Sequence, residues 1–175
     1  MKKIFIDVGS GDCTDIKNFR KKNKGFIYYA IDPSSNYLEK WDKLKKQISK
    51  IYFINKAAWI TDGKVTFYEQ RNDNPQGSTI VKEKQRVESM FETIVEGFDF
   101  SEWLKQFKDD YVIINMDIEG AEYDVLSKMI DDGTITIPKR IYYENHAHKI
   151  YNPRYIELAR VVEEKMNKLG VKFNL

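Results

Sequence analysis

The stretch Lys3-Ile4-Phe5-Ile6-Asp7-Val8-Gly9-Ser10-Gly11-Asp12-Cys13-Thr14 decides the fold. Its first half is a nearly continuous apolar run from Lys3 to Val8, which is typical of a strand buried on both faces in a parallel sheet. The glycines end this strand, and a helix is predicted from about Thr14 to Lys22. Glycines at such a junction let the backbone approach a ligand closely and leave amide donors at the helix start. We therefore expect a ligand-binding loop at residues 9–11.

Strands and helices alternate along the rest of the chain. Further core strands are predicted at residues 26–31, 51–54, 111–116 and 140–144, with one last short strand at 171–175. Helices are predicted after Ser34 or Ser35, after Ser101, after the strand at 111–116, and from Asn152-Pro153. This alternation within a single domain, residues 1–175, predicts an α/β, Rossmann-like fold with a mostly parallel sheet and helices on both faces.

Several smaller elements are also predicted. Residues 57–60 and 65–68 flank the turn signal Thr61-Asp62-Gly63, which predicts a β-hairpin insertion after the third strand. Alternation at residues 91–98 predicts an edge strand, and the polar residues 71–78 are the best candidate for a mobile loop. In the last helix, one buried face is predicted to hold Ile156, Ala159, Val162 and Met166.

Composition narrows the class of protein. Hydrophobic residues make up 42% of the 175 residues and charged residues 32%, as in ordinary globular proteins. No apolar run approaches the roughly 20 residues that span a bilayer, and the start of the chain does not resemble an export signal. We expect a cytoplasmic protein that does not bind membranes. Cys13 is the single cysteine, which excludes an internal disulfide. The net charge of +2 makes a nucleic acid partner unlikely, although lysines cluster at residues 20–24 and 40–50.

The acid that ends the second strand indicates a nucleotide-type ligand. Asp32 follows Asp7 by 25 residues, where a carboxylate can accept hydrogen bonds from both ribose hydroxyls. A dinucleotide site would want a third glycine where this chain has Thr14. Acids around the loop suit an ammonium or sulfonium group better than a phosphate, which favours S-adenosylmethionine. Asn55 and Ala57-Ala58 would then lie beside the adenine.

A second block of acids follows the fourth core strand. Residues 116–125 hold four carboxylates and a glycine, and Asp117 stands directly at the strand exit. Ligands of open α/β sheets bind at this edge, so Asp117 is expected to point into the crevice. The alternative is that Glu119, Glu122 and Asp124 only decorate the first turn of the following helix, where acids favour the helix dipole.

The succession of motifs resembles the FkbM family of methyltransferases. The motifs are Phe5-Ile6-Asp7-Val8-Gly9, Asp32-Pro33, Asn55-Lys56-Ala57-Ala58, Phe100-Ser101-Glu102-Trp103-Leu104, Asp117-Ile118-Glu119-Gly120-Ala121-Glu122, Val125-Leu126 and Ile141-Tyr142-Tyr143-Glu144-Asn145-His146. The resemblance implies a class I methyltransferase fold, S-adenosylmethionine as methyl donor, and O-methylation of sugars, glycans or other small molecules. The residues expected to bind the donor are Asp7, Gly9, Ser10, Gly11, Thr14, Asp32, Pro33, Ser34, Asn55, Ala57, Ala58, Asp117 and Glu119.

The chain also departs from the family pattern. The family usually has an alanine and an asparagine after its first glycine and another glycine further on, whereas this chain has Ser10-Gly11-Asp12-Cys13. The sequence also begins at the first strand, without the helical segment that often precedes it in the family. Acceptor binding is therefore expected from residues 71–78, from residues 147–154, or from a partner subunit in a homo-oligomer.

Three side chains are candidates for the chemistry. Asp117 is the first choice for a base or an acceptor-orienting group, with His146 and Glu144 at the next strand exit as its neighbours. His148 is a weaker candidate. The same three side chains could also ligate a divalent metal ion, which the sequence leaves open.

The sequence is also compatible with other functions. The lysine-rich helices motivate an RNA methyltransferase, and a non-catalytic Rossmann-like binding module is a third alternative. A dinucleotide-dependent oxidoreductase is disfavoured by the missing third glycine.

Overall fold

The computed structural model describes residues 1–70 and 76–174. Its main sheet has six strands in the order β3-β2-β1-β7-β8-β9, and every neighbouring pair is parallel. The strands are β1 (Lys3–Val8), β2 (Phe26–Ile31), β3 (Ile51–Ile54), β7 (Tyr111–Met116), β8 (Pro138–Tyr143) and β9 (Phe173–Asn174). The predicted α/β class with a mostly parallel sheet is confirmed.

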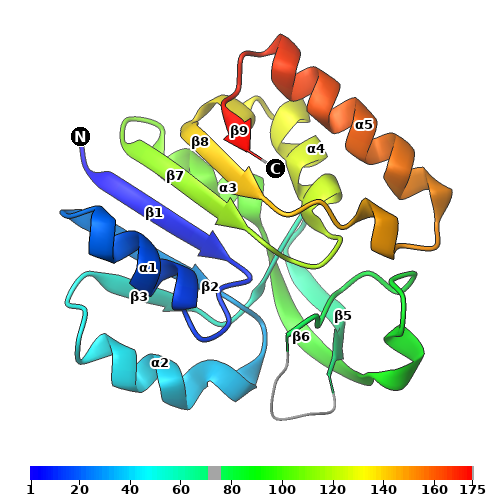
Figure 1. Cartoon of the computed structure of the whole chain (residues 1–175), viewed down its shortest axis with the longest axis horizontal. Coiled ribbons are helices and arrows are strands. Elements are labelled where there is room, and N and C mark those ends of the chain that lie inside the picture. The colour runs from blue at the N-terminus through cyan, green and yellow to red at the C-terminus, as the bar shows by residue number, and fades with distance from the viewer. Residues whose placement is uncertain (71–75, 175) are drawn as a thin grey trace.

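Helices cover both faces of this sheet, as predicted (Figure 1). On one face, α1 (Thr14–Lys22) and α2 (Leu38–Lys45) pack through Ile16, Trp41 and Leu44. On the other face lie α3 (Phe100–Leu104), α4 (Glu122–Asp131) and α5 (Pro153–Lys168). Short 3-10 helices complete the chain at η1 (Ser35–Tyr37), η2 (Val87–Ser89), η3 (Lys105–Phe107), η4 (Thr134–Thr136) and η5 (Ala147–Lys149).

The second sheet has three strands, and its pairing differs from two of the predictions. Its order is β4-β6-β5, with β4 (Ala57–Trp59), β5 (Gly63–Glu69) and β6 (Phe91–Asp99). The predicted hairpin pairing between the first two of these strands is wrong, because each pairs with β6 instead. Residues 91–98 therefore form a central strand rather than an edge strand. The nine-residue β6 offers hydrogen-bonding groups on both edges, which satisfies more backbone than a short hairpin would.

Three local predictions also need correction or restriction. Asp99, not Ser101, caps α3, because its side chain accepts a hydrogen bond from the Glu102 amide. Ser101 is buried inside the helix and hydrogen-bonds Thr134 instead. In α5, Ile156 is exposed and Tyr155 occupies the buried face. Most of the loop predicted at residues 71–78 lies outside the described residues.

The sheets together place the carboxyl ends of the central strands in the middle of the molecule. Figure 1 shows β1, β7 and β8 pointing toward the second sheet, so their exits face it. No helix in residues 1–70 and 76–174 has the length and hydrophobicity needed to cross a bilayer.

Candidate active site

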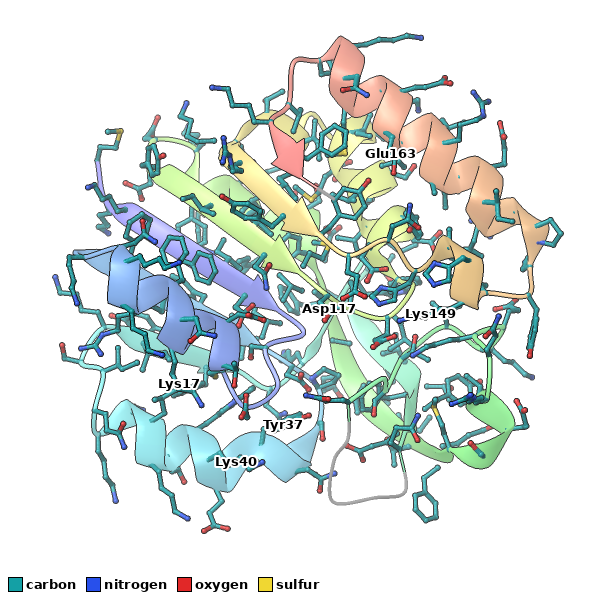
Figure 2. The ribbon with its side chains drawn as sticks, in the orientation of Figure 1. Lys17, Tyr37, Lys40, Asp117, Lys149 and Glu163 are labelled. Atoms are coloured by element: carbon teal, nitrogen blue, oxygen red, sulfur yellow. The ribbon has the colours of Figure 1, made fainter. Side chains whose placement is uncertain are left out.

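A cavity of about 480 Å³ lies at the carboxyl ends of β1, β2 and β7. Twelve of the predicted site residues line it: Gly9, Ser10, Gly11, Thr14, Asp32, Pro33, Ser34, Ala57, Ala58, Asp117, Glu119 and Glu144. Tyr37, Lys40, Lys56 and residues 76–80 add further wall. Figure 2 shows Asp117 near the centre of the molecule, with Tyr37 and Lys40 toward the α2 side.

The glycine loop is packed against the exit of β7. Gly9 has a φ of +81°, and a Cβ at this position would lie 1.8 Å from the Asp117 carbonyl oxygen. The Gly9 amide donates a hydrogen bond of 2.8 Å to the Ile31 carbonyl oxygen. Only glycine fits such a close approach with a positive φ. The loop therefore fixes the backbone of Asp117 relative to β2.

Asp32 organises the other side of the cavity. Its carboxylate accepts hydrogen bonds from the Gly11 amide and the Ser34 amide, each of 2.9 Å. Burial raises the pKa of Asp32 to about 6, although both hydrogen bonds lower it. The Ser34 hydroxyl in turn donates to Glu69 of the second sheet. The carboxylate thus holds the glycine loop and the start of η1 together.

Asn55 plays a different part from the one predicted. Its side chain is absent from the cavity wall and donates hydrogen bonds to the carbonyl oxygens of Asp32 and Ser34, at 2.9 and 3.2 Å. Asn55 therefore supports the loop from outside.

Asp7 is likewise buried beneath the cavity rather than exposed in its wall. One of its carboxylate oxygens accepts a hydrogen bond of 2.8 Å from Asn115, and the other has no partner among the described residues. Burial, reinforced by neighbouring acids, raises the pKa of Asp7 to about 7. The structure gives Asp7 no direct access to a ligand in the cavity.

The acid block at the exit of β7 forms a tight turn into α4. Glu119 has a φ of +56° and Gly120 a φ of +114°. Glu122 is fully buried, and its carboxylate accepts hydrogen bonds from the amides of Ile118 and Gly120, at 2.9 and 2.8 Å. The interpretation of Glu122 as a decoration of the first helical turn is therefore wrong. For Asp124 a structural role is the better interpretation, because its carboxylate accepts hydrogen bonds from Arg154 and Tyr155 of α5.

His146 lies behind the cavity wall and is completely buried. Its Nδ1 is 3.0 Å from Glu122 Oε1, and its Nε2 faces the carboxylates of Asp117, Glu119 and Glu144. Burial lowers the pKa of His146, but the hydrogen bond and charge of Glu122 and the charges of Glu119 and Asp117 outweigh burial and raise the pKa. His146 therefore lies beside Asp117 and Glu144, as predicted, but it does not line the cavity.

Asp117 has the altered acidity expected of a functional carboxyl. Burial and the charge of Glu119 raise its pKa to about 6. Its side chain keeps 43% of its surface exposed, whereas the Oδ1 atom is buried and has no hydrogen-bond partner among the described residues. The exposed part of the carboxylate therefore belongs mainly to Oδ2.

Two lysines of this site were not predicted. Lys84 is buried, its Nζ lies 2.6 Å from Glu119 Oε2, and it donates to the Gly77 carbonyl oxygen. Lys149 Nζ lies 3.9 Å from Glu144 Oε1 and 4.0 Å from Glu119 Oε2. Lys84 stands in an irregular segment between β5 and β6, and no pattern in the sequence distinguishes it from the exposed lysines.

The fold is that of a Rossmann-like protein, and its cavity at the carboxyl ends of the strands has the size of a small-molecule site. The methyltransferase FkbM domain model matches residues 7–173, nearly the whole chain, and the chain belongs to this family. Family membership supports methyltransferase activity in general. The chain has no significant match among curated proteins or solved structures.

Proposed function

We propose that the protein transfers the methyl group of S-adenosylmethionine to a hydroxyl of a sugar, a glycan or another small molecule. The observation that carries this proposal is the continuity of the cavity, which runs from the glycine loop and Asp32 to Asp117 and Glu144. One end thus offers contacts for an adenosine, and the other offers carboxylates for a hydroxyl. Its volume of about 480 Å³ is typical of small-molecule sites.

The cavity residues fit such a donor. Asp32 ends β2, where a carboxylate can accept hydrogen bonds from ribose hydroxyls. Ala57 and Ala58 leave room for a flat base, and residues 9–11 line the cavity just before α1. The amides of residues 9–11 already donate to the Ile31 carbonyl oxygen and to Asp32, so they hold the loop in shape. Gly11 has a φ of +48°, which other residues rarely adopt, and a Cβ there would be in ordinary van der Waals contact with the Tyr37 ring at 3.4 Å.

The acceptor side must align a hydroxyl and take its proton. When bound, S-adenosylmethionine supplies a methyl group activated by the sulfonium and leaves as a neutral thioether, so the leaving group needs no acid. Asp117 accepts the hydroxyl proton while the new O–C bond forms and the C–S bond breaks. Alignment of two reactants can contribute roughly 7–11 kcal/mol to lowering the barrier, and a positioned base contributes about 10²- to 10⁴-fold in rate.

Calorimetry with S-adenosylmethionine tests the donor, and a screen of sugars and glycans with labelled donor tests the acceptor. Asp117→Asn should lower turnover about 10²- to 10⁴-fold while donor affinity stays within about threefold. Asp109→Asn, an exposed substitution, serves as the control. Absence of donor binding would refute the proposed function, and normal turnover in Asp117→Asn would refute the role of this carboxylate.

A further inference from the structure

The imidazole of His146 has a hydrogen-bond partner at Nδ1 and none at Nε2 among the described residues. Its Nδ1 lies 3.0 Å from Glu122 Oε1, and Glu122 is fixed by two backbone amides. An ionised carboxylate only accepts hydrogen bonds, so this contact keeps a proton on Nδ1 and leaves the Nε2 lone pair free in the neutral imidazole. Histidines that ligate metal ions usually donate their other ring N–H to a carboxylate or carbonyl in this way, and His146 meets that requirement.

The distances from Nε2 fit ligands of one ion better than hydrogen bonds. Nε2 lies 3.7 Å from Asp117 Oδ1, 3.5 Å from Glu119 Oε2 and 3.5 Å from Glu144 Oε1, and it has no hydrogen-bond partner in residues 1–70 and 76–174. A nitrogen donor in this setting normally reaches its acceptor at about 2.9 Å. Two ligand atoms that each lie about 2.1 Å from an ion are separated by about 3.0–3.6 Å at ordinary ligand angles, so Glu119 and Glu144 fall within this range and Asp117 lies just beyond it.

The charges around His146 leave room for a cation. Four carboxylates surround the imidazole, and they face the ammonium groups of Lys84 and Lys149. When no proton occupies Nε2, two negative charges remain uncompensated, and a cation bound to Nε2 would take the place of that proton. Lys84 is committed to Glu119 at 2.6 Å and Lys149 lies 3.9 Å from Glu144 Oε1, so the uncompensated charge lies toward Asp117 and Glu122.

We propose that a divalent cation binds at the cavity wall between His146 Nε2 and Asp117 Oδ1, with Glu144 Oε1 on its exposed side. Asp117, Glu122 and His146 each offer a ligand atom, and these atoms lie within 4.8 Å of one another. One imidazole nitrogen with carboxylate oxygens is a donor set that suits a cation of the Mn²⁺ type. The chemical role of this cation rests on the proposed function. With Oδ1 on the cation, Asp117 keeps Oδ2 for the acceptor, and the cation lowers the pKa of an acceptor hydroxyl that reaches it.

The test is direct binding of Mn²⁺, read from the loss of the electron paramagnetic resonance signal of the free ion. The protein is first dialysed against chelator and then against chelator-free buffer. We expect one Mn²⁺ per chain in the wild type, and at least about tenfold weaker binding in Glu144→Gln and Glu122→Gln. Glu144 is exposed, so its substitution leaves the fold intact, which circular dichroism verifies. His148→Gln changes the only other histidine, which is exposed, and should bind as the wild type does.

Each outcome decides the proposal. No Mn²⁺ binding by the wild type overturns it, and so does binding that Glu144→Gln and Glu122→Gln leave unchanged. Calorimetry with S-adenosylmethionine in the presence of chelator tests the proposed function separately. A protein that binds Mn²⁺ at this site but not the donor would retain the cation site and lose the methyltransferase proposal.

Discussion

The clearest quantitative prediction concerns Asp7→Asn and the dependence of stability on pH. The Asp7 carboxyl is fully buried, one of its oxygens has no partner among the described residues, and burial raises its pKa from 3.8 to about 7. The folded protein therefore keeps this proton over a range of pH in which the unfolded chain has lost it. Stability from this group is fully present below about pH 4 and is lost as the pH rises to about 7.

The pKa difference sets the size of the effect. At full ionisation it corresponds to about 4 kcal/mol, and between about pH 5 and pH 8 it corresponds to about 3 kcal/mol. Asparagine cannot ionise, and its side-chain oxygen can still accept the hydrogen bond from Asn115. Asp7→Asn should therefore lose about 3 kcal/mol less stability than the wild type over this interval.

Urea unfolding at a series of pH values measures this difference, because titrations common to both proteins cancel in the comparison. Asp109→Asn, at an exposed position, should give a curve parallel to the wild type. If the curves of Asp7→Asn and wild type are also parallel, the buried carboxyl is not protonated in the folded protein and the reasoning fails.

Two further substitutions test the framework of the site. Gly9→Ala places a Cβ 1.8 Å from the Asp117 carbonyl oxygen and should abolish donor binding in calorimetry, whereas Gly25→Ala, which meets nothing within 4 Å, should leave it unchanged. Lys84→Met leaves a partly buried carboxylate without its cation and should lower the free energy of unfolding by about 3 kcal/mol in urea denaturation. Lys82→Met, at an exposed position, should change it by less than about 0.5 kcal/mol. Equal effects in either pair would contradict the contacts described.

The main sheet was predictable because its strands are continuous apolar runs. Lys3–Val8 and Tyr111–Met116 are buried from both faces, so hydrophobicity alone marks them. The second sheet was not predictable in the same way, because apolar and polar residues alternate along β6 and most of its side chains are exposed. Alternation identifies a strand but contains no information about which neighbours it pairs with, and the turn signal at Thr61-Asp62-Gly63 suggested a local partner where the actual partner is distant.

The candidate site was predictable to the extent that strand exits meet at one edge. Asp32 and Asp117 each end a strand, so their convergence follows from parallel topology. The direction of a side chain does not follow from it. Asp7 lies near the same edge, but its side chain points into the core. Only its burial against His146 distinguishes Glu122 from an ordinary acid at the start of a helix.

The contact of Gly9 with the Asp117 backbone has a consequence for engineering new acceptor specificity. Substitutions that move the backbone between residues 117 and 122 would shift the glycine loop at the same time, so we expect such variants to bind the proposed donor more weakly. Residues 76–80 line the cavity from outside the main sheet. Thr79 donates a hydrogen bond to the Glu119 carbonyl oxygen, and Lys84 joins the Gly77 carbonyl oxygen to the Glu119 carboxylate. We therefore expect that randomising positions 76, 78 and 80, while keeping Thr79 and Lys84, would vary the proposed acceptor-binding wall and leave the glycine loop and Asp32 unchanged.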